Sequence, residues 1–437
     1  MTYENFKNEL FDISKKLGLD ACEINYEGEK EFNLSLANGE LDSYKDAESF
    51  KVKVVVLKNG KSGAAFTEIL ENPEKIINEA VENMEIVESE EIVNLHDGSG
   101  EYLNAELYKG NFEKEDVSDK LKFIKNIYDA AKSDSRIKMV PNIVYQNFVS
   151  DIRIANTYGL DKKSKSDGGF CYSMTVAEDV SPRSGFYYEV GKSPENLTLA
   201  IGEKAKEDAI AKIGSKSVKS GKYNIIINNM AFSDILSLLN SMISAENVQK
   251  EISPLKGKID QKIGSDILTV KDIAIYPGSL TNRTFDREGF PTSDKTIIEN
   301  GVLKTFLYDI KAALKENKKS TGNSTQGGIA PVNMVIEPGK LSFEELVKEL
   351  GNGIIITEVE GMHSGANPVS GEFSLGAKGL LVENGEITKG VEQITLSDNF
   401  IVMLSKIKAI GNDTLLSYSN IITPSVIIEN VDIAGNE

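Results

Sequence analysis

Apolar residues recur along this chain with two different spacings, and each spacing predicts a different kind of element. Between residues 3 and 17, apolar side chains recur every three or four positions, which predicts an amphipathic helix. Over residues 32–36 and 50–56 they alternate with polar side chains, which predicts two half-buried strands. Asn38-Gly39 lies between them, and both residues tolerate the positive φ angles of a tight turn. The N-terminal region is therefore predicted to be a helix followed by a β-hairpin.

The same spacings predict a mixture of helices and strands over the rest of the chain. Asn72-Pro73 predicts a helix start, and Ser342 with Glu345 forms a capping box at another. Further helices are expected at 118–133, 194–213 and 231–250, and strands at 143–148, 152–156, 170–176, 223–227 and 354–359. Because helices and strands do not alternate regularly, the pattern predicts an α+β fold with largely antiparallel sheets.

The polar Gly/Ser stretch at residues 214–221 predicts a domain boundary. It divides the chain into an N-terminal domain of mixed helices and strands, residues 1–213, and a C-terminal domain, residues 222–437. Residues 88–110 are acidic and irregular, which indicates a connector and a second boundary inside the first domain.

Composition excludes several classes of protein. The chain has 437 residues and a net charge of −18, so its surface repels nucleic acid. No apolar run reaches the roughly 20 residues that a membrane span needs. The first residues lack the basic head and apolar core of a signal peptide, so we expect a cytoplasmic protein. Cys22 and Cys171 stand far apart, which excludes a disulfide scaffold and predicts two buried structural thiols.

The chain is poor in the residues that bind transition metals. Its two histidines, His96 and His363, lie 363 − 96 = 267 positions apart, and neither HExxH nor HExxxH occurs. The same shortage argues against a Ser-His-Asp triad, and no serine lies in a GxSxG context. We therefore predict no catalytic residue and no metal ligand in this chain, while a site made only of carboxylates stays open.

Two loops are worth following. One comes after the predicted core strand 354–359, and loops at strand ends often carry function. His363, Ser364, Asn367 and Ser370 in that loop are predicted to line a peptide-binding cleft. The other is the charged turn from Asp286 to Glu288, where an ion pair within the turn is expected.

Nine segments in the second half carry a resemblance to the TldD/PmbA family. They are FDREGFPT (285–292), IENGV (298–302), KSTGNSTQGG (319–328), SFEELVKELGNG (342–353), TEVEG (357–361), NPVSGEFSLGAKG (367–379), VENGEI (382–387), GND (411–413) and PSVIIENVDIAG (424–435). In the first half, Asn38-Gly39-Glu40 and the strand-turn-strand at 52–65 resemble the family's N-terminal domain. The order and spacing of these segments carry the likeness over nearly the whole chain.

The resemblance implies a cytoplasmic peptidase built from two related subunits, with an α/β N-terminal domain and a β-rich C-terminal domain. TldD-type subunits hold zinc with HExxxH on a helix and a distant cysteine, whereas TldE-type subunits, also called PmbA, lack these ligands. In this chain the two histidine positions fall near Ser237 and Met242, so it resembles the PmbA/TldE type. The family also implies an active site enclosed between the subunits, with zinc held by the TldD-type partner and none by this chain.

Three functional hypotheses follow. The leading one is a subunit without its own catalytic site that shapes a peptide channel for an HExxxH-bearing partner in a heterodimer. A homodimer of this chain is the other assembly that we expect. The second is a stand-alone hydrolase with an unrecognised site. The third is a peptide-binding or regulatory protein that is not an enzyme.

Overall fold

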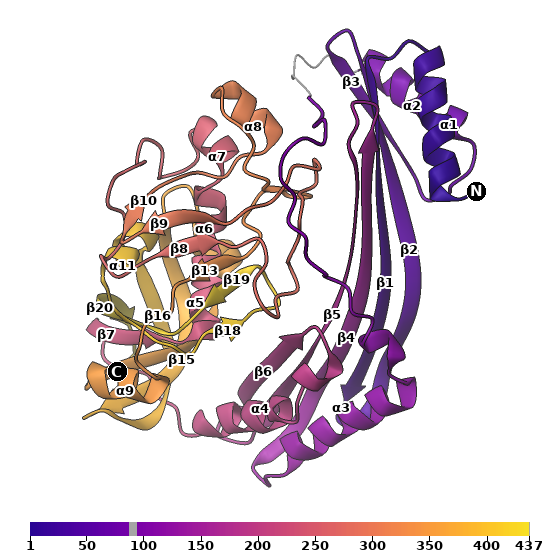
Figure 1. Cartoon of the computed structure of the whole chain (residues 1–437). Helices are drawn as coiled ribbons and strands as arrows, with labels where there is room; N and C mark the ends of the chain where they lie inside the picture. The colour runs from indigo at the N-terminus through magenta and orange to yellow at the C-terminus, as the bar shows by residue number, and fades with distance from the viewer. Residues whose placement is uncertain (87–93, 437) are drawn as a thin grey trace.

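One long antiparallel sheet organises the first half of the chain (Figure 1). The computed structural model describes residues 1–86 and 94–436, and within them this sheet has the strand order β3-β2-β1-β4-β5-β6. The strands are β1 Ala21–Ala37, β2 Glu40–Lys58, β3 Lys61–Thr67, β4 Ile137–Asn156, β5 Asp161–Ala177 and β6 Arg183–Gly191. Asn38 and Gly39 join β1 to β2 with φ angles of 50° and 87°, which confirms the predicted hairpin turn.

Four helices cover one face of this sheet, two at each end (Figure 1). They are α1 Tyr3–Lys16, α2 Pro73–Ile86, α3 Val117–Lys132 and α4 Ala200–Ala211. Alternate residues of β1 face the same side, so Cys22 and Ile24 pack with α1 and α2 while Leu34 and Leu36 pack with α3 and α4. The other face of the sheet is polar near its middle and lies toward the second half of the chain.

A closed ring of strands and a second sheet build the other half. The ring runs β16-β15-β14-β7-β20 and closes through pairing of β16 with β20, and β17 pairs with β20. Its strands are β7 Gly221–Ile227, β14 Gly353–Glu360, β15 Glu372–Glu383, β16 Glu386–Asn399, β17 Ile407–Ile410 and β20 Val426–Ala434. The second sheet has the order β10-β9-β8-β13-β19-β18, with strands β8 Val270–Asp272, β9 Lys295–Glu299, β10 Val302–Leu303, β13 Met334–Ile336, β18 Leu415–Leu416 and β19 Ile421–Thr423.

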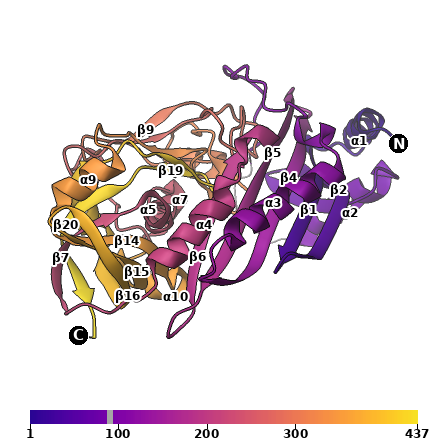
Figure 2. The ribbon, with the colours of Figure 1, turned by 90° about the horizontal axis from the view of Figure 1, so that it is seen from below.

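Helix α5 (Asn229–Leu236) lies in the core between these two sheets, seen end-on in Figure 2. Phe232, Ile235 and Leu236 are fully buried there against side chains of both sheets. The remaining elements are α6 Leu238–Met242, α7 Ala245–Gln249, α8 Ile310–Lys315, β11 Ser324–Thr325, β12 Gly328–Ile329, α9 Phe343–Leu350, α10 Met362–Gly365 and α11 Phe400–Ser405, with short 3-10 turns at Phe112–Lys114 and Pro194–Asn196.

The predicted fold class is confirmed. The structure combines helices with mainly antiparallel sheets, and among the strands named above, within the described ranges, only β7 with β14 and β13 with β19 pair in parallel. Cys22 and Cys171 are both buried and free, as predicted. Among the residues described, no helix has the length and apolar character needed to cross a membrane. Of the predicted connector 88–110, residues 88–93 lie outside the described part, and residues 94–110 form neither helix nor strand.

Several element predictions were wrong in detail. The single helix expected at 231–250 is three helices, because Ser237 and Ser244 interrupt it and Ser244 adopts an extended conformation that caps α7. The apolar spacing continues across both breaks, so periodicity alone does not reveal them. The helix expected from residue 194 is a 3-10 turn followed by α4, and the two strands expected at 143–156 are the single strand β4.

Candidate functional site

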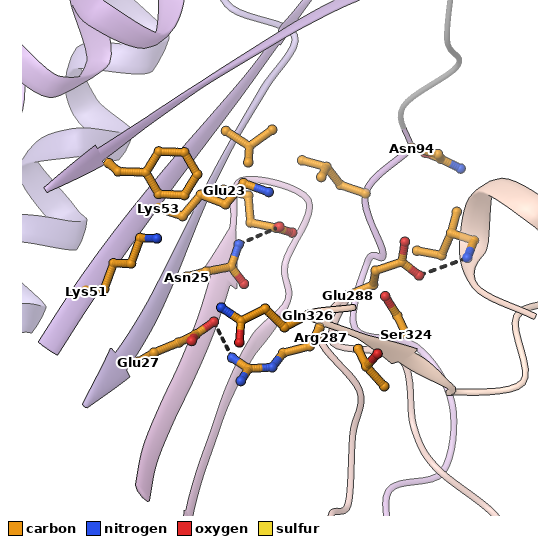
Figure 3. A pocket seen from close by; sticks show the side chains of 15 residues that line it. Glu23, Asn25, Glu27, Lys51, Lys53, Asn94, Arg287, Glu288, Ser324 and Gln326 are labelled. Atoms are coloured by element: carbon orange, nitrogen blue, oxygen red, sulfur yellow. Dashed lines mark hydrogen bonds and ion pairs between the residues drawn. The ribbon is translucent and has the colours of Figure 1, made fainter. Parts of the chain in front are cut away.

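A charged pocket of about 440 Å³ lies between the polar face of the first sheet and loops of the second half (Figure 3). We call it the charged pocket. Its walls come from β1, β2 and β3 on one side and from residues 287–288, 310 and 324–326 on the other. The lining side chains are Glu23, Asn25, Glu27, Lys51, Lys53, Val55, Phe66, Asn94, Leu95, Arg287, Glu288, Ile310, Ser324, Thr325 and Gln326.

Strand geometry explains why so many polar groups meet here. Glu23, Asn25 and Glu27 alternate along β1 with Ile24 and Tyr26, so the three polar side chains share one face. Their partners on β2 are Val55, Lys53 and Lys51, directly opposite in the antiparallel register. Cross-strand neighbours point to the same side of a sheet, so carboxylates and ammonium groups lie next to each other.

The turn from Phe285 to Phe290 is held by its own first carboxylate. Asp286 is 2% exposed, and its Oδ1 accepts hydrogen bonds from the backbone N–H groups of Glu288 and Phe290, each at 2.9 Å. Its Oδ2 accepts a third from Ser324 N, also at 2.9 Å. Burial nevertheless raises the pKa of Asp286 to about 6, although these hydrogen bonds oppose the rise.

Two glutamates of the charged pocket hold their protons unusually well. Burial, and then the nearby Asp286 carboxylate, raise the pKa of Glu288 to about 8, while Glu288 Oε2 accepts a hydrogen bond from Ile310 N at 2.8 Å. Burial also raises the pKa of Glu23, against the hydrogen bonds donated by Asn156 and Asn25. Carboxyl groups with raised pKa values can act as proton donors or acceptors near neutral pH.

The prediction of an ion pair within the charged turn was wrong. Arg287 pairs instead with Glu27 on β1, so it joins the second half of the chain to the sheet of the first half (Figure 3). Asp286 instead accepts hydrogen bonds from backbone N–H groups of the turn and of Ser324. Sequence adjacency could not reveal a partner that comes from the opposite half of the chain.

A second connection runs through His96 and Tyr102. Tyr102 Oη donates its proton to the carbonyl oxygen of Gly289 at 2.8 Å, so the contact at 3.1 Å with His96 Nε2 requires the imidazole to be the donor. The His96 ring also lies 4.8 Å from the Phe290 ring, and burial lowers the pKa of His96. Asn156 on β4 donates to the carbonyl oxygen of His96 at 2.8 Å. His96 is therefore part of a connection between the two halves.

Replacing Tyr102 by phenylalanine should lower the free energy of unfolding by about 1–2 kcal/mol, because Gly289 O and His96 Nε2 both lose their partner. The difference is measured by urea unfolding at pH 7. Tyr44→Phe is the matched control, since Tyr44 is an exposed tyrosine on β2. Equal stability of both variants would show that the Tyr102 hydroxyl contributes nothing.

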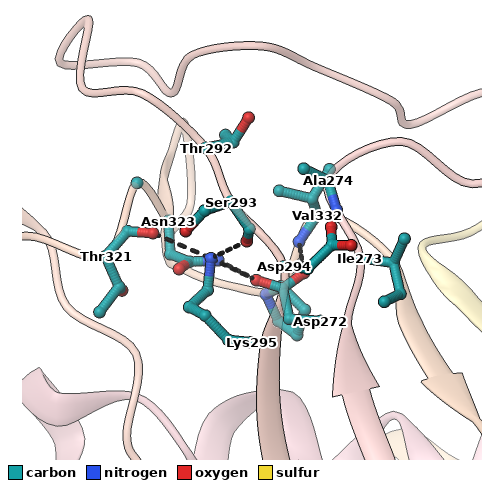
Figure 4. Close-up of polar contacts among 12 residues, drawn as sticks. Asp272, Ile273, Ala274, Thr292, Ser293, Asp294, Lys295, Thr321, Asn323 and Val332 are labelled. Atoms are coloured by element: carbon teal, nitrogen blue, oxygen red, sulfur yellow. Dashed lines mark hydrogen bonds and ion pairs between the residues drawn. The ribbon is translucent and has the colours of Figure 1, made fainter. Parts of the chain in front are cut away.

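A buried aspartate fixes the loops behind the charged pocket (Figure 4). Asp272 at the end of β8 is fully buried and accepts hydrogen bonds from Asn323 Nδ2 and Val332 N, both at 2.7 Å, and from Asn333 N at 3.2 Å. Lys295 Nζ lies 3.2 Å from the same carboxylate and also donates to Ser293 O and Thr321 O. The loop that carries Ser324 is thereby tied to β8 and β9.

A second cavity, of about 560 Å³, lies where the end of the first sheet meets α5. We call it the aromatic groove. Its lining residues are Met174, Ser184, Gly185, Phe186, Tyr187, Tyr188, Lys204, Asp208, Lys212, Asn228, Asn229, Met230, Ala231, Ser233, Asp234, Thr357, Glu358, Leu415, Ser417 and Tyr418. Phe186 and Tyr188 are two residues apart on β6 and so share one face of the strand, and their ring centroids lie 5.9 Å apart. The Tyr418 ring lies 5.3 Å from the Tyr188 ring, edge to face.

The predicted cleft residues lie outside both cavities. His363 and Ser364 are exposed on α10, and Asn367 and Ser370 are exposed in the turn before β15. Asn367 Oδ1 accepts from Val369 N and Ser370 N, at 2.9 and 3.4 Å, so it stabilises its own turn. The preceding strand β14 does reach the aromatic groove through Thr357 and Glu358. Peptide binding by the four residues stays a prediction.

Models of three successive domains of one metallopeptidase family match this chain. They are the PmbA/TldA metallopeptidase domain 1 at residues 22–84, the central domain at 110–213 and the C-terminal domain at 220–435. A metalloprotease PmbA homolog from Buchnera aphidicola is 31% identical over 310 residues, which are 70% of this chain and 68% of the relative. The chain belongs to the TldD/PmbA family.

Two solved structures resemble this family member over nearly its whole length. A protein from Thermotoga maritima MSB8, described as a candidate modulator of a DNA gyrase, is 48% identical with a TM-score of 0.96, covering 99% of this chain and 100% of that one. TldE from Thermococcus kodakarensis is 25% identical with a TM-score of 0.90, covering 98% and 100%. The resemblance to the TldD/PmbA family is confirmed.

The resemblance places the family's two zinc-binding histidines near Ser237 and Met242, and these two residues do not fit a zinc ion. Ser237, between α5 and α6, is exposed, and its hydroxyl donates to Asp234 O at 2.6 Å. Met242 is fully buried in the core. Zinc sites in proteins use imidazole, thiolate or carboxylate donors, and these two residues supply none. Across the part of the chain that the structure describes, no three His, Cys, Asp or Glu side chains are grouped so as to hold a metal ion.

Sequence reasoning missed most residues of both cavities. The alternation of Glu23, Asn25 and Glu27 with buried residues was a usable signal for a polar sheet face. Asp234 also gave a usable signal, because it is the only charged residue in the sequence of α5. Tyr188 and Tyr418 carried none, because they come from separate elements that only the fold brings together.

Proposed function

We propose that this chain is a PmbA/TldE-type subunit that shapes the peptide channel of a zinc metallopeptidase without supplying its catalytic metal site. The observation that carries the proposal is the chemistry of the α5–α6 segment. The catalytic subunits of the family carry HExxxH in this segment. This chain has an exposed serine and a core methionine where they have the two histidines. The likeness to the TldE from Thermococcus kodakarensis supports the same assignment.

The environments of the histidines and cysteines of this chain support the proposal. His96 is engaged with Tyr102, and His363 lies exposed on α10 in the opposite half. Cys22 and Cys171 are buried, and burial raises the pKa of both thiols, which disfavours the thiolate that binds zinc. The proposal therefore places zinc in a TldD-type partner, in a cytoplasmic complex that degrades peptides. The two cavities give a peptide room to lie between the halves of this chain.

The test compares the purified chain alone with the chain plus an HExxxH homologue from the same genome. Alone, we expect less than stoichiometric zinc by elemental analysis and no cleavage of a peptide library. Together, the two should copurify and cleave peptides, and replacing the glutamate of the partner's HExxxH should abolish cleavage. Stoichiometric zinc and peptidase activity in the isolated chain would refute the proposal.

One observation favours a second candidate, a stand-alone hydrolase. Glu288 lines the charged pocket with a pKa of about 8, as an acid–base group would. If the isolated chain hydrolyses peptides and Glu288→Gln abolishes this activity, the second candidate replaces the first. A pull-down from the source cell that recovers no HExxxH homologue would instead favour a binding or regulatory protein.

A further inference from the structure

The aromatic groove contains one carboxylate without a counter-charge. Asp234 projects from α5 into the groove, and its side chain has no hydrogen bond or ion pair within residues 1–86 and 94–436. It remains open to solvent, yet the surrounding walls remove enough water to raise its pKa to about 6. At neutral pH it is therefore an ionised group that lacks a protein partner.

The two lysines of the groove are engaged with other groups. Lys212 Nζ lies 2.8 Å from Asp208 and 3.3 Å from Glu358, and it donates to Ser184 O at 3.0 Å. Lys204 Nζ donates to Tyr187 Oη at 3.0 Å. Neither lysine compensates Asp234, so its charge is available to a ligand.

Aromatic rings stand beside this carboxylate. Tyr188 and Tyr418 meet edge to face at 5.3 Å, and Phe186 continues the row on β6. Burial raises the pKa values of Tyr188 and Tyr418, and the Asp234 carboxylate adds to the rise in each, so its charge acts on both rings. Tyr418 is 59% exposed and Phe186 38%, so both rings remain accessible from the groove.

An organic cation is the ligand that this combination fits. The face of an aromatic ring attracts a cation through its quadrupole, and a nearby carboxylate adds direct charge attraction. A metal ion is a poor fit, because Ca²⁺ or Mg²⁺ needs several oxygen ligands and Asp234 offers one carboxylate. The net charge of −18 further favours a cationic ligand over an anionic one.

We propose that Asp234 with Tyr188, Tyr418 and Phe186 binds an ammonium group of a peptide, either its free N-terminus or a lysine side chain. This inference rests on the proposed function, because it names the peptide chemistry that the channel prefers. The groove is wide enough for the residues that flank such a group, and its hydroxyl and amide side chains can pair with their backbone.

The experiment measures binding of fluorescent hexapeptides to the isolated full-length chain by anisotropy. Four peptides share one sequence and carry both ammonium groups, only the N-terminal one, only a lysine, or neither, with acetyl groups as blocks. We expect the uncharged peptide to bind about tenfold more weakly than the best cationic one. The singly charged peptide that keeps its affinity identifies the N-terminus or the lysine as the source.

Variants test the named residues. Asp234→Asn should weaken binding of the cationic peptide about tenfold and leave binding of the uncharged peptide unchanged. Tyr418→Leu should weaken binding of the cationic peptide severalfold, whereas Tyr418→Phe should leave it unchanged. Asp12→Asn, at an exposed aspartate on α1, is the matched control and should bind as the unaltered chain does. Thermal unfolding verifies that each variant is folded.

Equal affinity for charged and uncharged peptides, unchanged binding by Asp234→Asn, or no binding of any peptide would overturn the inference. These outcomes are distinct from failure of the proposed function. That failure appears as zinc and activity in the isolated chain, or as no activity when the unaltered chain is combined with an HExxxH partner.

Discussion

Replacing Asp272 by alanine should destabilise the second half of the chain by about 3–5 kcal/mol, one of the two largest effects that we expect of a single substitution. The carboxylate is fully buried and receives hydrogen bonds from Asn323 Nδ2, Val332 N and Asn333 N. Lys295 Nζ, only 13% exposed, lies 3.2 Å away. The substitution leaves three buried donors unsatisfied and a nearly buried ammonium group unpaired.

Asp272→Asn separates charge from hydrogen bonding. The amide oxygen can still accept from a backbone donor, but the amide nitrogen would face other donors, and the charge opposite Lys295 is lost. We therefore expect an intermediate loss of stability. Asp266→Ala is the matched control, since that aspartate is 81% exposed and forms a surface ion pair with Lys262.

Hydrogen exchange of β8, β9 and β13 is the appropriate measurement, because a chain with two large halves need not unfold in one step. Protection should fall in these strands and in residues 321–333 of Asp272→Ala. Native protection in those strands would show that water replaces the carboxylate without cost. Because the loop at 321–326 also lines the charged pocket, the variant should alter that pocket as well.

Local signals along the chain were enough to predict much of the fold. Alternation over residues 32–36 and 50–56, with Asn38-Gly39 between them, predicted the central hairpin of the first sheet. The capping box of Ser342 and Glu345 predicted α9, where both reciprocal hydrogen bonds form. The apolar run at 354–359 predicted β14, which pairs with β7 and β15 as an interior strand. These features depend on interactions between residues close in sequence.

The closed ring of strands and the edge strand β6 could not be predicted in the same way. Closure depends on pairing of Thr395 to Ser397 with residues 432–434, which no local pattern specifies. Strand β6 contains Gly185 and three adjacent bulky residues, so it shows no clean alternation.

The cavities depend even more on the tertiary structure. The charged turn at Asp286 was recognised, but its arginine pairs with β1, and Asp234 meets Tyr418 only after the chain has folded. The cleft residues were placed by loop position alone, and that criterion selected an exposed turn. The buried carboxyl groups, which only the structure reveals, indicate the charged pocket better than any sequence feature does.

Glu288→Gln should make the protein more stable than the unaltered chain at pH 8 by about 2–4 kcal/mol, with a much smaller difference at pH 5. Burial and the Asp286 carboxylate raise the pKa of Glu288 to about 8 from an ordinary value of 4.5. The folded chain thus keeps a proton that the unfolded chain loses between these values. The stability that this proton provides is complete below pH 4.5 and is lost as pH rises through 8.

Glutamine resembles the protonated acid in shape, and its side-chain oxygen can still accept the hydrogen bond from Ile310 N. Urea unfolding at pH 5, 6.5 and 8 measures the difference between variant and unaltered chain, which should grow steadily with pH. Asp286 and Glu23, whose pKa values are also raised, are present in both chains, so subtraction removes their contributions except for their charge interaction with Glu288, which is part of the effect measured. Glu299→Gln, at an exposed glutamate that ends β9, controls for the loss of one carboxyl group. A difference that is the same at all three pH values would mean that Glu288 is ionised in the folded protein, and the charged pocket would then hold a stable negative charge rather than a proton.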